Sequence, residues 1–264
     1  MMWCDRCGGA LFVRAGRDRS GRQLHRCRGC GRRLTARSLT AFRGRHFSAE
    51  VILLAVRWYL CYRLSYRELA EWLAESGVCV DPSTIWDWVQ AYAPKLSALA
   101  QAHCSSVGTR WRVDETYVKV AGHQLYLYRA IDEHGQVLKC LLSERRDTIA
   151  AQIFLGLAQD AAGVLPPRVI TDRAGCYVEA VPLECPGAKH LTRRYLNNRL
   201  ERDHQHLKGR IRPMRGFKTW QAAWTFCRAH DVVRNLRGGH SPLAVGATPR
   251  ERLEIGWAAL ASAL

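Results

Sequence analysis

Acidic side chains are scarce in this chain of 264 residues: 23 Asp and Glu stand against 40 Lys and Arg, a formal net charge of +17. This surplus exceeds what solubility needs, so we expect a polyanionic partner, either nucleic acid or a membrane surface. The chain lacks any run of about 18 apolar residues and any signal-peptide pattern. We therefore expect nucleic acid as the polyanion, no membrane partner, and a cytoplasmic, nucleoid-associated protein.

Internal repeats and low-complexity linkers are also lacking. Apolar residues make up 48% of the chain, which permits an ordinary packed core, and the length has room for one large domain or two to three small ones. The eleven cysteines are odd in number, and four of them have the spacing of a metal site. We therefore expect the other seven to be reduced rather than part of a disulfide framework.

Residues 1–47 carry two Cys-x-x-Cys pairs, Cys4 with Cys7 and Cys27 with Cys30. Two such pairs complete a tetrahedron of thiolates, so we predict a zinc ribbon with one structural Zn²⁺. A segment this short and rich in arginine cannot form a stable core without such a metal cross-link. Its twelve Arg outnumber its two Asp, which favours contact with nucleic acid; dimerisation is the alternative role.

Residues 48–104 predict three short helices in the order of a helix-turn-helix domain. The first covers residues 50–60, and the second follows a capping box of Ser65 and Glu68. Asp81 caps the third, which is the predicted recognition helix. The DNA contacts predicted on its outward face are Ser83, Thr84 and Trp86. Small helical bundles that bind no DNA share this pattern.

Three acidic residues lie in different local patterns further along the chain. Asp114 and Asp172 lie in apolar runs that predict strands, whereas Glu201 lies in a polar helical stretch over residues 195–208. Several carboxylates converging on one point suit two divalent ions about 4 Å apart, because hard cations prefer oxygen ligands. We predict that these three acids are catalytic and hold two Mg²⁺ or Mn²⁺ ions against a DNA phosphate.

Other acids near these three have structural interpretations. Glu115 points to the opposite face of an extended strand, and Asp132 lies in a turn between two apolar runs. Asp203 lies on a different face of the helix from Glu201, yet it is the first alternative as third acid. His204 shares the Glu201 face, where it either touches substrate phosphate or packs as an ordinary helix histidine.

Five blocks of sequence occur in an order that resembles a known family, the DDE transposases with an RNase H-like catalytic domain. Within it the chain resembles the IS6 family of bacterial and archaeal insertion sequences. The resemblance covers roughly residues 46 to 240. Only 28 residues separate Asp172 from Glu201, fewer than the family usually has, and we attribute this to a shortened loop. The blocks are residues 111–120, 126–132, 169–172, 197–204 and 215–218.

The resemblance implies cutting at transposon ends, followed by transfer of the freed 3′-hydroxyl into target DNA. It implies the terminal inverted repeats and the target as partners, a homodimer or higher oligomer, and a replicative outcome. Lys208 matches the basic position that follows the glutamate of the family. We expect the basic segment that begins there to grip the DNA backbone. Its predicted contacts are Lys208, Arg210, Arg212, Arg215 and Lys218.

We predict an α/β fold with four parts: a zinc ribbon (1–47), a helix-turn-helix domain (48–104), an RNase H-like DDE core of order β-β-β-α-β-α (105–240) and a C-terminal helical tail (241–264). In the helix after the basic segment, Trp220, Trp224 and Phe226 are expected in the core. The alternative function is a non-catalytic, sequence-specific DNA-binding protein derived from a transposase. The short spacer favours that alternative, whereas the intact set of acids argues against it.

Overall fold

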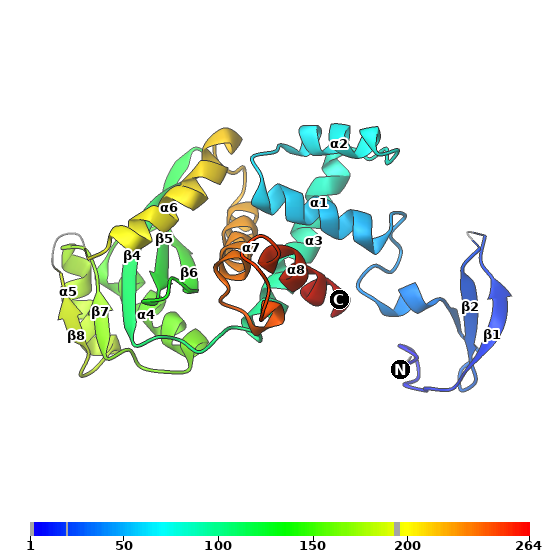
Figure 1. Cartoon of the computed structure of the whole chain (residues 1–264), viewed down its shortest axis with the longest axis horizontal. Helices are drawn as coiled ribbons and strands as arrows, with labels where there is room; N and C mark the ends of the chain where they lie inside the picture. The colour runs from blue at the N-terminus through cyan, green and yellow to red at the C-terminus, as the bar shows by residue number, and fades with distance from the viewer. Residues whose placement is uncertain (1–2, 20, 193–195) are drawn as a thin grey trace. The chain divides into compact units, whose positions relative to one another are not determined.

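The computed structural model describes residues 3–19, 21–192 and 196–264 (Figure 1). It separates into two compact units, Met1–Leu54 together with Leu264, and Ala55–Ala263. In the first unit, three antiparallel strands form a sheet in the order β1-β2-β3. These strands are β1 (Phe12–Arg17), β2 (Gln23–Cys27) and β3 (Arg33–Leu34), followed by a 3₁₀ turn at Ala36–Leu39.

The hydrophobic cluster beside this sheet is very small. Its buried residues are Cys4, Cys27 and Leu34, with Phe12 and Cys30 packed against them. Three of these five are cysteines. Hydrophobic burial alone is too limited to stabilise such a sheet, so its stability depends on a link between the cysteine side chains.

The three helices predicted after the ribbon are present: α1 (Ala49–Cys61), α2 (Tyr66–Glu75) and α3 (Pro82–Gln101). Both halves of the predicted capping box form at the start of α2, since Glu68 N donates to Ser65 Oγ and Ser65 N donates to Glu68. Asp81 accepts from Ser83 N at the start of α3. On α3 the apolar face is buried, as expected; it consists of Ile85, Trp88, Val89 and Tyr92.

A five-stranded mixed sheet forms the centre of the second unit, in the order β6-β5-β4-β7-β8. The first three strands form the predicted antiparallel meander, and β7 and β8 add in parallel. The strands are β4 (Arg110–Val120), β5 (His123–Ile131), β6 (Val137–Ser143), β7 (Arg168–Ile170) and β8 (Lys189–Leu191).

Helices cover this sheet (Figure 1). Helices α4 (Thr148–Ala162) and α5 (Gly175–Glu184) pack over apolar residues of β4 and β5, including Trp111 and Tyr128. The later helices are α6 (Asn198–Ile211), which crosses β4, α7 (Trp220–Gly238), which packs on β4 and β6, and α8 (Arg252–Ser262) against α7. The predicted RNase H-like order is therefore present, with additions.

The segment between the second and third acids is not the shortened loop that we predicted. It contains α5 and β8, so the order in the core is β-β-β-α-β-α-β-α. The sequence hides both elements, because α5 has Pro182 in its interior and β8 is only three residues long. The predicted start of the next helix, Tyr195, lies outside the described residues, and α6 is seen from Asn198.

The three aromatic residues expected in the core of α7 divide into two groups. Phe226 is buried, whereas Trp220 is 43% exposed and Trp224 half-buried. The two indole rings stack on each other with centroids 5.6 Å apart. The prediction was therefore wrong for Trp220, which is the first residue of α7 and has Trp224 as its ring partner in place of the core.

A buried cation ties α6 and α7 to the sheet. Arg129 on β5 has a side chain with no exposed surface, and it bonds Asp203 Oδ2 on α6 and Asp231 Oδ1 on α7, both at 2.5 Å. Arg234 on α7 donates to the other oxygen of Asp203 at 2.8 Å. Asp203 therefore has a structural role and is not free to act as the third acid.

Replacing Arg129 by Met is expected to lower the free energy of unfolding by about 3–5 kcal/mol, because two buried carboxylates lose their cation. Urea denaturation followed by circular dichroism measures the loss. Arg234→Met is the matched control: the Arg234 side chain is 27% exposed and bonds only one of the two acids, so its loss should be clearly smaller. Equal losses in the two variants would contradict this assignment.

The same cluster predicts a pH dependence of stability. Burial acts to raise the pKa of Asp203, but Arg129 and Arg234 outweigh it and lower that pKa to about 2. An acid with a depressed folded-state pKa stabilises above its unfolded pKa, near 4, and this contribution is lost as the pH falls from about 4 toward 2. Burial instead raises the pKa of Asp231, so the stability that is lost at low pH comes from Asp203. Denaturation at stepped pH should show the loss in the wild type and less of it in Arg129→Met.

Candidate active site

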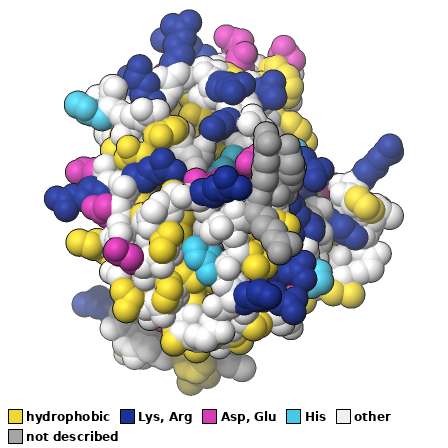
Figure 2. All heavy atoms as spheres, turned by 90° about the vertical axis from the view of Figure 1, so that its left-hand side faces the viewer, with side chains coloured by type: hydrophobic (Ala, Val, Ile, Leu, Met, Phe, Trp, Pro, Cys, Tyr) yellow, Lys and Arg dark blue, Asp and Glu magenta, His cyan; other side chains and the backbone are white. Residues whose placement is uncertain are grey.

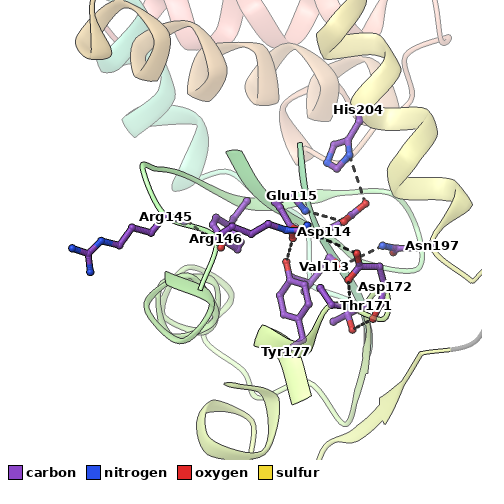
Figure 3. A network of polar contacts seen from close by, with 12 residues as sticks. Val113, Asp114, Glu115, Arg145, Arg146, Thr171, Asp172, Tyr177, Asn197 and His204 are labelled. Atoms are coloured by element: carbon purple, nitrogen blue, oxygen red, sulfur yellow. Dashed lines mark hydrogen bonds and ion pairs between the residues drawn. The ribbon is translucent and has the colours of Figure 1, made fainter. Parts of the chain in front are cut away.

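Asp114 and Asp172 meet where β7 ends. Strand β7 pairs with β4 only as far as Arg112 and Ile170, and each acid lies two residues beyond that last pair. Since the two strands are parallel, both carboxylates emerge at the same edge of the sheet. Carboxylate oxygens of Asp114, Glu115 and Asp172 all lie within 4.8 Å of one another (Figure 3).

Glu115, predicted to point to the opposite face of the strand and to be structural, has structural partners but also lies close to the other two acids. Its side chain does turn toward α5, where Oε2 accepts from the Tyr177 hydroxyl at 2.5 Å and Oε1 accepts from Arg146 Nε. However, Asp114 Oδ1 accepts from Glu115 N at 2.9 Å, which folds the Asp114 carboxylate back toward its neighbour. Strand alternation separates the two Cβ atoms, but this bond brings the carboxylates together.

Asp132 has the structural role expected of it. The carboxylate is fully buried, and Oδ1 accepts from three successive backbone N–H groups of the turn that follows β5. Oδ2 accepts from Gly108 N just before β4. The residue therefore closes the meander and takes no part in the acidic site.

Electrostatic repulsion is concentrated on Asp114. Burial raises the pKa of this carboxyl to about 7, with further contributions from the charges of Glu115, Asp172 and Glu201. Arg146 offsets part of this negative charge, because its guanidinium bonds Glu115 and lies 3.4 Å from Asp172 Oδ2. The site thus gathers more negative charge than its protein surroundings neutralise, which is the electrostatic condition that favours cations.

Helix α6 brings Glu201 toward these acids. Arg112 Nε donates to Leu196 O at 3.0 Å and Asn197 Nδ2 donates to Val113 O at 3.3 Å, so the start of the helix is fixed over β4. Glu201 is exposed in the first turn of α6. It lies outside the tight group of Asp114, Glu115 and Asp172, although its charge contributes to the raised pKa of Asp114.

His204 is buried beside Asp114. It is 4% exposed, and its Nδ1 lies 3.9 Å from Asp114 Oδ2. Burial and the positive charge of Arg129 lower the pKa of His204 to about 3, so the imidazole is neutral at neutral pH. Of the two predicted roles, the structure supports the packed helix histidine.

Both predicted metal sites have suitable donors. The carboxylate group offers oxygen ligands within 4.8 Å of one another. In the first unit, the four Sγ atoms of Cys4, Cys7, Cys27 and Cys30 also lie within 4.8 Å, with two pairs at 3.5 Å. Tetrahedral zinc with Zn–S bonds of about 2.3 Å needs sulfur atoms a little under 4 Å apart, so the cysteines fit that ion.

Comparison with known proteins agrees with this geometry. Residues 108–240 match the family model described as a DDE domain. The chain is 41% identical over 174 residues to the transposase for insertion sequence-like element IS431mec of Staphylococcus aureus, which covers 64% of this chain and 77% of that protein. The chain belongs to the IS6 family of DDE transposases.

A second relative of this transposase is the transposase for insertion sequence element IS257 in transposon Tn4003 of Staphylococcus aureus, also 41% identical over 174 residues, with coverage of 64% and 77%. Among solved structures, the HTLV-2 integrase catalytic core domain in complex with magnesium matches with a TM-score of 0.39. It is 15% identical, and the match covers 56% of this chain and 97% of that chain. As a DDE transposase, the protein is a polynucleotidyl transferase.

Four of the five basic residues predicted to contact DNA are accessible. Lys208 is half-buried, and Arg212, Arg215 and Lys218 are exposed. Arg210 is the exception, since it is 5% exposed, donates to Tyr59 O and lies over the rings of two aromatic residues, Tyr59 and Phe226. The prediction that Arg210 binds DNA was therefore wrong, because its side of α6 faces α1.

Lys and Arg side chains predominate over acidic ones on the face of the transposase shown in Figure 2. On α3, two of the predicted DNA contacts are exposed, Ser83 and Trp86, and Thr84 is half-buried. In the described part of the chain, no helix is both long and apolar enough to cross a membrane.

Sequence reasoning missed the partners that hold the acids of this transposase. Tyr177 is fully buried and bonds Glu115, although the two residues lie 62 positions apart. Arg146 bridges Glu115 and Asp172 from the segment before α4. The one available signal was the pair of adjacent acids at 114 and 115, since two neighbouring carboxylates in a strand need a cation or a hydroxyl nearby.

Proposed function

We propose that this transposase binds the terminal inverted repeats of its element, cuts the DNA there and transfers the freed 3′-hydroxyl strand into target DNA. The observation that carries this proposal is the convergence of Asp114 and Asp172 at one sheet edge, with Glu201 on the helix that crosses it. Polynucleotidyl transfer needs such a group of carboxylates beside a surface that binds phosphate.

The roles of the acids follow from their positions. Asp114 and Asp172 would hold the two Mg²⁺ or Mn²⁺ ions, and Glu201, which is exposed, would complete the set. Ions bound there would supply Lewis-acid stabilisation of an in-line displacement. Asp114, whose pKa is raised to about 7, is the acid that a nearby cation would most favour in its charged form.

The reaction would proceed without a covalent link between protein and DNA. Water attacks first at the transposon end, and the freed 3′-hydroxyl then attacks the target strand. Lys208, Arg212 and Arg215 would hold backbone phosphates, since lysine and arginine neutralise phosphates without reading sequence. Tyr177 and Arg146 would position Glu115 and Asp172 during both steps.

The other parts of the chain would bring DNA to this site. A zinc-bound ribbon over residues 1–47 and the helix-turn-helix over residues 48–104 would bind the terminal repeats, with Ser83, Thr84 and Trp86 as contacts. Two ends must be held together for transposition, so at least a dimer would act. These functions fit a protein that works at the nucleoid in the cytoplasm.

Strand joining by the purified protein on the flanking DNA of its own element, with Mg²⁺ or Mn²⁺, tests the proposal. The wild type is expected to join strands, and Glu201→Gln is expected to abolish joining because the amide loses the charge of the third acid. Arg202→Gln, an adjacent exposed residue, is the matched control and should join strands. Tight end binding without joining by the wild type would instead favour the non-catalytic DNA-binding alternative.

A further inference from the structure

One edge of β4 is left open beside the acids. Strand β5 pairs with β4 over its whole length to Val120, whereas β7 pairs with it only from Arg110 to Arg112. Among the described residues, the only strand-like contact beyond that point is the bridge of Val120 with Phe217. The open edge therefore starts at the acidic site and runs for about 16 Å, at about 3.3 Å per residue.

A rigid turn closes the far end of this edge. Phe217 N donates to Lys119 O and Ala121 N donates to Phe217 O, both at 2.8 Å. Gly216 has φ of 99°, and a Cβ atom there would lie 2.8 Å from Lys119 O, so the close approach requires glycine. The turn that carries Arg215 is thus fixed to the β4–β5 hairpin.

The hairpin, the end of α6 and this turn enclose a groove of about 680 Å³. Four of the residues that line it are cations, Lys119, Lys208, Arg212 and Arg215, and none of its described lining residues is acidic. The volume lies within the range of ligand sites, about 300–1,000 Å³. A groove with this charge suits the sugar-phosphate backbone of a nucleic acid strand.

Tyr117 lines the groove with an exposed aromatic ring, which phosphate binding alone does not require. Its side chain is 47% exposed, and its ring is supported from one side by Tyr126, with centroids 5.3 Å apart. It lies three residues after Asp114, about 10 Å along the strand, on the same strand face as Glu115 of the acidic group. An exposed aromatic ring between cations is the arrangement on which proteins stack the bases of single strands.

We infer that this groove holds an unpaired nucleotide next to the reacting phosphate, with its base stacked on Tyr117. A base inside a duplex already has both faces covered by its neighbours, so only a melted end offers a face to this ring. The inference rests on the proposed function and adds the form of its substrate: a DNA end that is frayed beside the cleaved bond. Tyr117 is then a positioning residue for the strand.

Binding of the full-length protein to its own end DNA, with abasic nucleotides placed one at a time near the cleaved bond, tests this inference. Tyr117→Leu keeps apolar bulk but loses the ring, and Tyr117→Phe keeps the ring. On DNA with an unpaired end, Tyr117→Leu should bind about 5- to 150-fold more weakly than the wild type, whereas Tyr117→Phe should bind equally well. At one abasic position the wild type should fall to the affinity of Tyr117→Leu.

Two results would overturn the inference: equal binding by Tyr117→Leu and the wild type, or a difference that persists at every abasic position. Strand joining by the wild type, measured on the same DNA, separates this failure from that of the proposed function. If the wild type joins strands and Tyr117→Leu binds the DNA as tightly as the wild type, only the stacking role of Tyr117 is contradicted. Absence of joining by the wild type would remove the function on which it rests.

Discussion

Replacing Asp172 by Asn is expected to lower the rate of strand joining by at least about 10³-fold while end binding is retained. Asparagine preserves the shape of the side chain but removes the charge that would hold a divalent ion. Lewis-acid stabilisation contributes several kcal/mol to such a transition state, and each 1.36 kcal/mol corresponds to a factor of ten in rate. Single-turnover joining of labelled end DNA measures the effect.

Asp160→Asn is the matched control for Asp172→Asn. Asp160 is an exposed acid of α4 outside the acidic site, so its replacement changes the net charge equally and should leave joining unchanged. Asp172 is 39% exposed at its side chain, and its replacement should leave the unfolding temperature close to that of the wild type. Joining at the wild-type rate by Asp172→Asn would show that the reacting phosphate lies elsewhere.

Removal of metal from the first unit is expected to unfold its sheet and leave the second unit folded. The hydrophobic cluster beside the sheet has only three buried residues, two of them proposed zinc ligands, so little else opposes the entropy of the chain. Hydrogen exchange after treatment with a strong zinc chelator should show loss of protection in β1 and β2. Protection in β4 and β5 should persist, since Arg129 and the apolar core hold that sheet.

A cysteine comparison gives the control for metal removal. Cys27→Ala should lose both bound zinc and protection in β1 and β2, whereas Cys79→Ala, at an exposed cysteine outside the cluster, should lose neither. Zinc content measured by mass spectrometry gives a readout independent of activity. Retained protection of β1 and β2 in metal-free protein would mean that the sheet is held by contacts other than the thiolates.

The sequence predicted correctly those helices whose first residue is determined by a capping side chain only a few positions away. Ser65 with Glu68, and Asp81, accept hydrogen bonds from backbone N–H groups two or three positions away, and both were predicted as helix starts. The convergence of Asp114 and Asp172 was also predictable, because parallel strands in a strand-helix-strand unit end at the same edge.

Features set by distant partners were not predictable in this way. Arg210 looked like a phosphate ligand because its neighbours are basic, but it is buried against Tyr59, 151 positions earlier. Glu115 was expected on the opposite face because side chains alternate along a strand, but alternation does not determine where the end of a flexible side chain lies. Helix α5 carries a proline in its interior, and its tertiary packing through Tyr177 outweighs the local preference against a helix.

The contacts of α6 with the sheet affect how much the length of the chain between the second and third acids can vary within this family. Arg129 holds Asp203, and Arg112 and Asn197 hold the first turn of the helix. Glu201 is thus positioned by the contacts that Leu196, Asn197 and Asp203 make with the sheet. Changes in chain length ahead of Leu196 should therefore leave the position of Glu201 unchanged, because extra residues in a connection add little free energy. A spacer of 28 residues is then compatible with an active transposase.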